Sequence, residues 1–214
     1  MIKGEGGEIS TVEHFLAAVS ILGLTSLSCE LDGPEMPACD GSAADFVSML
    51  DSAGIVESEH WADPFRPSSP IVVEDGDAII RLSPADGLRI SYFLDLSQAG
   101  LPDEEVDYRI TEDVFRRTIC RARTFVPAVL APKLLAQGYG KGATAENTLL
   151  LGDPDSIPRF ENEAATHKVL DIIGDLAALG VPICGHIAAS RSGHSQNARL
   201  ASLILAEMDR RTTA

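Results

Sequence analysis

Apolar side chains recur at helical spacing in several stretches of the chain. The first stretch follows Ser10, where Glu13 stands three residues later and apolar residues then appear at positions 15, 16, 19 and 22. A serine followed at this distance by a glutamate is typical of a capping box, so we expect a helix that Ser10 caps and that ends near Gly23. The same spacing predicts helices over residues 42–50, 111–121, 161–179 and 195–210, and a short helix that closes at 134–138.

Alternating or continuous apolar runs predict the strands. Residues 71–73 and 78–82 flank the sequence Glu74-Asp75-Gly76-Asp77, a pattern typical of a β-hairpin. Further strands are expected over residues 26–31, 88–96, 148–151 and 182–188. Because strands and helices come mixed, without a regular alternation of the two, the pattern favours an α+β fold over a doubly wound parallel sheet.

The sequence also indicates where the chain divides. Between residues 57 and 69 the periodicity is lost and prolines become frequent. We therefore expect a first domain over residues 1–56, a linker over 57–69 and a second domain over 70–214. A first domain of that length is near the size at which a single hydrophobic core becomes marginal.

The composition is that of a folded, acidic protein. The 214 residues are 45% hydrophobic and 23% charged, and the formal net charge is −15. This charge would repel a phosphate backbone, so binding to nucleic acid is not expected. No apolar run reaches the length of a membrane span, and residues 1–8 lack the hydrophobic stretch of a signal peptide, so we expect a cytoplasmic protein.

Candidate chemistry lies on the helix predicted over residues 161–179. His167, Asp171 and Asp175 follow one another at intervals of four residues, so they share one face of this largely apolar helix. A polar face on so apolar a helix indicates a partner that satisfies it. A bound metal ion is one interpretation, and a histidine–aspartate pair at the protein surface is the other.

Two further histidines are candidates. His14 stands beside Glu13 in the first turn of the N-terminal helix, and His194 follows Gly193 where a strand passes into the last helix. Next to a bound metal, His14 could be a ligand while Glu13 takes a proton from the metal's water. Either histidine could equally be an ordinary residue at the start of a helix. If His14 converges with the polar face of the 161–179 helix, the ligand set is that of an open catalytic zinc site.

A series of ordered motifs carries a resemblance to one enzyme family. The motifs are Ser10-Thr11-Val12-Glu13-His14, Glu30-Leu31-Asp32-Gly33-Pro34-Glu35, Asp40-Gly41-Ser42-Ala43, Arg121-Ala122-Arg123-Thr124-Phe125, Arg159-Phe160, the segment from His167 to Leu176, and Ser192-Gly193-His194. In this order and at this spacing the chain resembles the UDP-3-O-acyl-N-acetylglucosamine deacetylases. These are the zinc-dependent amidohydrolases of lipid A synthesis in Gram-negative bacteria, and the resemblance covers nearly the whole chain.

The resemblance implies a metal centre and a general base. His14, His167 and Asp171 would bind Zn²⁺ and leave a position for water. Glu13 would take the proton from that water as it attacks the acetamide carbonyl.

The resemblance also implies the residues that meet the substrate. The hydroxyl of Thr124 would help to hold the developing oxyanion. His194 would be the acid near the leaving amine, and Asp175 would orient it and keep it charged. Lys168 and Phe125 would contact the substrate, a UDP-linked acylated amino sugar.

The family fold is two similar α+β domains, each a sheet with packed helices, with the active site between them. Because the chain begins almost at the Thr-Val-Glu-His motif, we expect an N-terminally truncated first domain that exposes a sheet edge or needs a partner chain to complete it. The acyl chain of the substrate could bring the protein into peripheral contact with a membrane. Two other functions stay open: a catalytically impaired relative that binds zinc or a partner protein, and an amidase acting on another acylated amino sugar.

Overall fold

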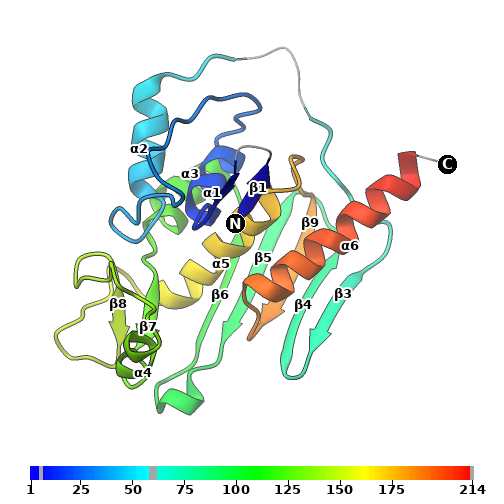
Figure 1. Cartoon of the computed structure of the whole chain (residues 1–214). Coiled ribbons are helices and arrows are strands. Elements are labelled where there is room, and N and C mark those ends of the chain that lie inside the picture. The colour runs from blue at the N-terminus through cyan, green and yellow to red at the C-terminus, as the bar shows by residue number, and fades with distance from the viewer. Residues whose placement is uncertain (5–6, 58–61, 213–214) are drawn as a thin grey trace.

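The computed structural model describes residues 1–4, 7–57 and 62–212 (Figure 1). Its helices are α1 (Glu13–Ile21), α2 (Ala44–Ala53), α3 (Glu112–Arg117), α4 (Ala131–Ala136), α5 (Glu163–Ala177) and α6 (His194–Thr212). Its strands are β1 (Ile2–Gly4), β2 (Gly7–Ile9), β3 (Ile71–Asp75), β4 (Ala78–Ser83), β5 (Leu88–Leu94), β6 (Glu104–Arg109), β7 (Phe125–Pro127), β8 (Leu149–Leu151) and β9 (Gly185–Ser190). Single turns of 3-10 helix lie at Ser97–Ala99 and Ile119–Arg121.

The central sheet has five strands in the order β3-β4-β9-β5-β6. Strands β5 and β9 run parallel, whereas the other neighbouring pairs run antiparallel. Alternate side chains point to opposite faces of a strand, and in β4 this buries Ile80 and Leu82 while Arg81 is exposed. A mixed sheet combined with helices confirms the predicted α+β class.

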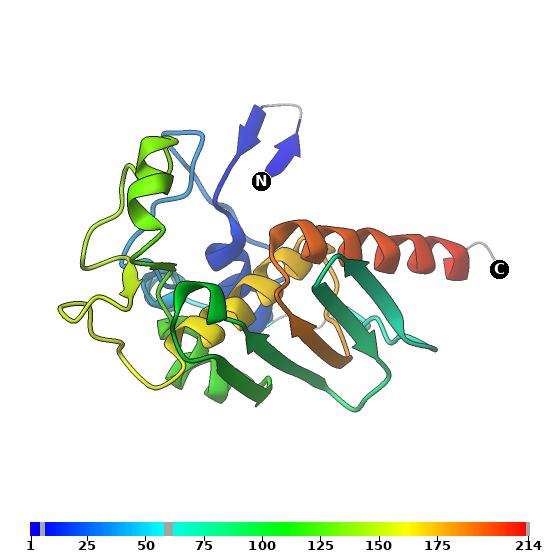
Figure 2. The ribbon, with the colours of Figure 1, turned by 90° about the horizontal axis from the view of Figure 1, so that it is seen from below.

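One face of the sheet is covered by two helices. Helix α5 packs on β5 and β6, and α6 packs on β3 and β4. Figure 2 shows both helices on the same side of the sheet. Helix α1 in turn packs against α5, so α5 is buried on nearly all sides. The polar residues His167 and Asp171 of α5 are therefore held inside the molecule.

A single hydrophobic core joins these layers. Leu170 and Ile172 of α5, Ile90 of β5 and Ile187 of β9 are all fully buried within it. The core also includes Ala17 of α1, whose small side chain suits a close approach of two helices. Burying each large aliphatic side chain stabilises the fold by about 1.5–3 kcal/mol. The same packing that stabilises the fold thus fixes α1 against α5.

Several predicted elements are confirmed. Strands β3 and β4 form the expected hairpin, with Gly76 in its turn at a φ of 58°. Helix α5 and strands β5, β8 and β9 lie within two or three residues of the predicted bounds. These elements could be predicted because the sequence shows either strong periodicity over a long stretch or a turn sequence between two apolar runs.

Two predictions near the N-terminus are wrong. Ser10 does not cap α1, because its amide donates to the carbonyl of Pro34 at 2.9 Å and its hydroxyl also points to that oxygen. The N-cap is Val12, which makes no side-chain capping bond. Residues 26–31 form no strand and are mostly exposed. An extended segment needs a neighbouring strand to complete its ladder, and the described residues offer none there.

Other elements escaped the sequence pattern. Strand β6 has the sequence Glu-Glu-Val-Asp-Tyr-Arg, which is too polar to indicate a strand, and only Val106 in it is buried. It forms because β5 supplies an antiparallel partner at the edge of the sheet. The helix expected over 111–121 is split into α3 and a 3-10 turn.

The predicted linker over residues 57–69 falls partly outside the described residues, at 58–61. Phe65 within it is buried and forms a β-bridge with Ile183. Before the linker, the described part of residues 1–56 contains the β1–β2 hairpin with α1 and α2. The division into domains stays a prediction.

None of the described helices is both long enough and apolar enough to cross a bilayer.

Candidate metal centre

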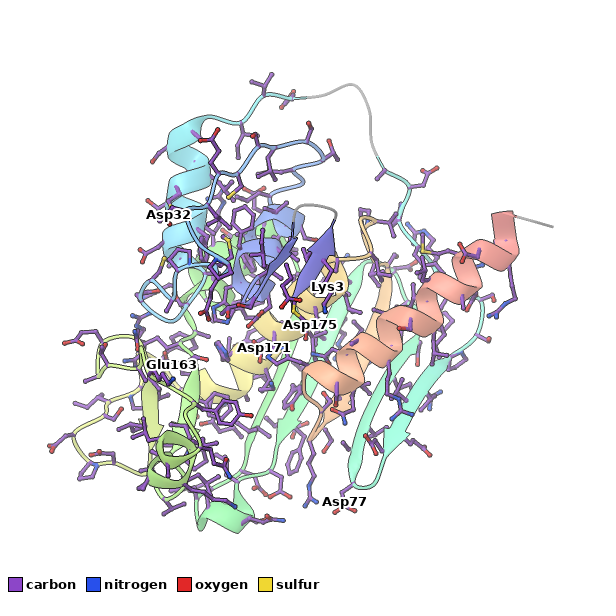
Figure 3. All side chains as sticks on the ribbon, in the orientation of Figure 1. Lys3, Asp32, Asp77, Glu163, Asp171 and Asp175 are labelled. Atoms are coloured by element: carbon purple, nitrogen blue, oxygen red, sulfur yellow. The ribbon has the colours of Figure 1, made fainter. Side chains whose placement is uncertain are left out.

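Helix α5 carries the polar face that the sequence predicts, with two of its three residues buried and Asp175 half buried. His167 and Asp171 are each only 3% exposed, and Figure 3 labels Asp171 and Asp175 along this helix. A histidine–aspartate pair at the protein surface would be solvated, so this burial removes the alternative of a surface pair. The buried polar side chains need partners inside the protein.

Helix α1 supplies the second histidine. The backbone of Thr11 has a left-handed φ of 55°, and its hydroxyl donates to Glu35 Oε1 at 2.7 Å. This bend directs the chain into α1, whose second residue is His14. His14 is 8% exposed and its ring meets that of His167 edge to face, with centroids 4.9 Å apart. Residues more than 150 positions apart in sequence therefore meet in one cluster.

The cluster has the geometry of a metal site. One ligand atom from each of His14, His167 and Asp171 lies within 4.8 Å of the others. Asp171 Oδ1 is 3.3 Å from His167 Nε2 and 3.7 Å from His14 Nε2. Metal bonds of about 2.0–2.2 Å in a tetrahedral site place neighbouring ligand atoms about 3.4 Å apart. Two imidazoles and one carboxylate at these separations fit a single metal ion.

The other nitrogen of His167 fixes its orientation. Nδ1 lies 3.0 Å from the carbonyl oxygen of Ala122, to which it can donate, and this leaves Nε2 as the atom that faces the cluster. Burial lowers the pKa of His167 to about 4, so the imidazole is neutral at pH 7. A neutral imidazole with its second nitrogen held by a carbonyl is the form in which histidine binds a metal.

The carboxylate of Asp171 is charged despite its burial. Burial alone would raise its pKa, but the ammonium group of Lys168 holds the pKa of Asp171 well below the usual range. Lys168 Nζ donates to Asp171 Oδ2 at 2.7 Å, which leaves Oδ1 for the two histidines. One oxygen of the carboxylate is thus satisfied by a cation and the other faces the candidate metal position.

Other predicted site residues lie beside the cluster. Thr124 Oγ1 is 3.3 Å from His167 Nε2, and the ring of Phe125 stands edge to face with that of His167 at 6.0 Å. Glu13 is half buried and immediately precedes His14. Among the described residues, no atom of Glu13 belongs to the cluster of ligand atoms.

His194 and Asp175 form a separate pair. His194 Nδ1 donates to Asp175 Oδ2 at 2.8 Å, from the first residue of α6 to the last polar residue of the α5 face. The hydrogen bond to Asp175, together with the nearby charge of Asp171, raises the pKa of His194 to about 9. His194 is therefore a protonated imidazole at neutral pH.

Sequence reasoning missed several residues that support the site. Glu163, which is almost fully buried, accepts from the guanidinium of Arg123 at 2.9 Å and 3.1 Å and from the Arg123 amide. This pair ties the segment that leads into Thr124 to the start of α5. One signal for the packing around the site was present in the sequence. Gly174 lies inside an apolar helix, where a glycine often marks the close approach of another backbone segment. Nothing in the spacing indicated that Arg123 and Glu163 would meet.

An α+β protein with two buried histidines and a carboxylate around one point has the donor set of a metal-dependent hydrolase. The family model described as UDP-3-O-acyl N-acetylglycosamine deacetylase matches residues 1–206 of this chain. The chain belongs to that family.

Named relatives agree with the family assignment. The UDP-3-O-acyl-N-acetylglucosamine deacetylase of Anaeromyxobacter dehalogenans is 37% identical over 210 residues, which cover 95% of this chain and 68% of the relative. The protein of the same name from Syntrophus aciditrophicus is 34% identical over 217 residues, which cover 100% of this chain and 69% of the relative. That from Brucella ovis is 34% identical over 204 residues, or 93% and 71% of the two chains.

Proposed function

We propose that this protein is a zinc-dependent deacetylase that hydrolyses the acetamide of UDP-3-O-acyl-N-acetylglucosamine in lipid A biosynthesis. The convergence of His14, His167 and Asp171 within 4.8 Å carries the proposal. It is supported by family membership and by the names of the relatives. We further propose that the protein works in the cytoplasm, where the acyl chain of its substrate brings it to the membrane surface.

His14, His167 and Asp171 would hold the zinc ion. In a site with three protein ligands and an open position, zinc polarises a carbonyl oxygen and makes water a stronger nucleophile near neutral pH. His167 would stay oriented by the Ala122 carbonyl, and Asp171 would stay ionised through Lys168. These supporting contacts would keep the ligands in place as substrate enters and product leaves.

Glu13 and His194 would move the protons. The carboxylate of Glu13, adjacent to His14, would accept a proton from the attacking water. His194 carries a proton at neutral pH and would deliver it to the amine as the carbon–nitrogen bond breaks. Asp175 would hold the charge of His194 before that transfer.

Thr124, Lys168 and Phe125 would meet the substrate. The hydroxyl of Thr124, 3.3 Å from His167 Nε2, would donate to the acetamide oxygen as it gains negative charge. Lys168 supplies a local cation in a protein of net charge −15, which suits an anionic UDP-sugar. Phe125, half buried beside His167, would pack against the sugar.

The site would lie between the two predicted domains. His14 comes from residues 1–56, whereas His167 and Asp171 come from residues 70–214. A site that takes its ligands from both sides of residues 57–69 is consistent with the proposed division of the chain.

The test is release of acetate from UDP-3-O-acyl-N-acetylglucosamine by the zinc-loaded full chain. Glu13→Gln should bind zinc as the parent does and lose activity by at least about a hundredfold, because only the base is removed. The matched control is Glu112→Gln, at an exposed glutamate of α3, which should keep full activity. Zinc content measured on each protein separates loss of the base from loss of the metal. If the parent releases no acetate, or if Glu13→Gln is as active as the parent, the proposed function is wrong.

A further inference from the structure

Asp175 has a second hydrogen-bond donor besides His194. Asn197 Nδ2 donates to Asp175 Oδ2 at 2.8 Å, the same oxygen that accepts from His194 Nδ1 at 2.8 Å. The two donors differ in environment, since Asn197 is fully buried whereas the His194 side chain is 57% exposed. The carboxylate is thus held from the interior by an amide and bonded on its solvent side by the imidazole.

The carbonyl oxygen of the Asn197 amide indicates why the side chain keeps its present orientation. Its Oδ1 is buried and has no hydrogen-bond partner among the described residues. Buried polar atoms are normally paired, so an unpaired carbonyl oxygen is a cost to the fold. Reversing the amide would set Oδ1 against the carboxylate, where two acceptors meet without a proton. The amide therefore keeps its donor on Asp175 although the acceptor stays unpaired.

Asn197 is itself fixed by the start of α6. Its backbone amide donates to the carbonyl of Gly193 at 3.0 Å, and this bond belongs to the first turn of the helix. His194, at the head of the same helix, has Asp175 as its hydrogen-bond partner. Rotation of the Asp175 carboxylate would therefore turn the imidazole or break its bond. A buried donor with a fixed backbone prevents that rotation.

We propose that Asn197 is a positioning residue, which holds the Asp175 carboxylate in the orientation that binds and charges His194. The effect on catalysis rests on the proposed function of His194 as proton donor. The effect on the imidazole does not rest on it, because it concerns only the contacts among these three side chains.

The charges that face His194 agree with this role. Asp175 and Asp171 of α5 raise the pKa of His194, and Lys168 of the same helix lowers it. The hydrogen bond to Asp175 is the largest of these influences. The pKa of His194 should therefore depend more on the orientation of the Asp175 carboxylate than on the charges of Asp171 and Lys168.

The first test is Asn197→Leu in the full chain, with the ring of His194 followed by NMR as pH is raised. Leucine is close in size and removes both the donor and the unpaired Oδ1, so the melting temperature and the zinc content should be kept. The pKa of His194 should fall from about 9 by about one unit, a tenfold change in proton affinity. In the acetate assay kcat should fall about tenfold while KM is kept, because ground-state contacts with the substrate are intact.

Two further variants complete the experiment. Ala198→Leu adds a leucine at the next, exposed position of α6 and should leave the His194 titration and kcat unchanged. Asp175→Asn should lower the pKa of His194 further, and adding Asn197→Leu to it should change nothing more, because both act through one carboxylate.

The proposal is overturned if Asn197→Leu leaves the His194 titration where it was, or moves it to higher pH. The second result would mean that Asn197 only competes with His194 for the oxygen. A lower melting temperature with an unchanged titration would also overturn it, since that is the result of a purely structural role. If the parent chain releases no acetate, the proposed function fails, while the titration still decides the role of Asn197.

Discussion

Gly174 of α5 faces the backbone carbonyl of Glu13 at the start of α1, and a β-carbon built on Gly174 would lie 1.9 Å from that oxygen. Only a glycine allows the two helices to meet at this point. His14 follows Glu13, and Asp171 lies three residues before Gly174. The approach of the two backbones is thus what brings the ligands of α1 and α5 together.

Substituting Gly174→Ala should separate these ligands. The added methyl group forces α1 away from α5, because the obstacle is rigid backbone rather than a flexible side chain. We expect the free energy of unfolding in urea to fall by about 1–3 kcal/mol and zinc affinity to fall at least tenfold. Gly33→Ala is the control, since a β-carbon there meets nothing within 4 Å and the residue lies in an exposed loop. Equal zinc affinity in the two variants would contradict this role for Gly174.

Zinc should stabilise the folded protein through the three ligands. Binding to the native state alone raises the free energy of unfolding by about 2.7 kcal/mol when free zinc is at 100 times its dissociation constant. His167→Gln should abolish most of the rise in melting temperature on adding zinc. His186→Gln is the matched control, because His186 bonds to Ser91 on the sheet and lies outside the ligand cluster. A parent protein whose melting temperature ignores both zinc and chelator would argue against the metal centre.

The activity should fall in alkaline solution as His194 loses its proton. A proton donor works in its charged form, so kcat should be high below the pKa of about 9 and decline as pH rises through it. The pair also stabilises the fold: its contribution is complete below the ordinary histidine pKa of about 6.5 and is lost as pH rises through about 9. That contribution should be under about 1 kcal/mol, because His194 is largely exposed and solvent screens the pair. Asp175→Asn should move the alkaline decline of kcat to lower pH, and an unmoved profile would exclude His194 as the acid.

Glu163→Gln should destabilise the protein strongly. The substitution leaves the buried guanidinium of Arg123 without its counter-charge, and breaking such a pair costs about 3–5 kcal/mol. The control is Asp113→Asn, which breaks the exposed pair with Arg117 and should cost less than about 1 kcal/mol. Both values come from urea denaturation of the full chain. If the two substitutions cost the same, the buried pair does not hold Thr124 and the start of α5 in place.

Local spacing explains why much of the site could be predicted. The intervals of four between His167, Asp171 and Asp175 put these residues on one face of any helix. The periodicity of the apolar residues around them predicted that this segment is helical. The β3–β4 hairpin was likewise encoded by its turn sequence. In both cases the residues that determine the structure are close neighbours in the chain.

Contacts between distant segments explain the failures. Ser10 has the sequence of a helix cap but bonds to Pro34, and strand β6 forms only because β5 offers it an edge. No local spacing pattern indicates a role for Asn197, Arg123 or Glu163. Each of them bonds to a residue in a distant segment, and the sequence does not show which segments meet.

The sequence by itself determined the α+β class, the polar face of α5 and, through its motifs, the family. Tertiary structure alone decided that His167 and Asp171 on this face are buried, that α1 approaches α5 at Gly174 and brings His14 to them, and that Asn197 donates to Asp175. The reason is physical: periodicity fixes the direction of a side chain relative to its own helix or strand, whereas the distance between two helices depends on how all their side chains pack.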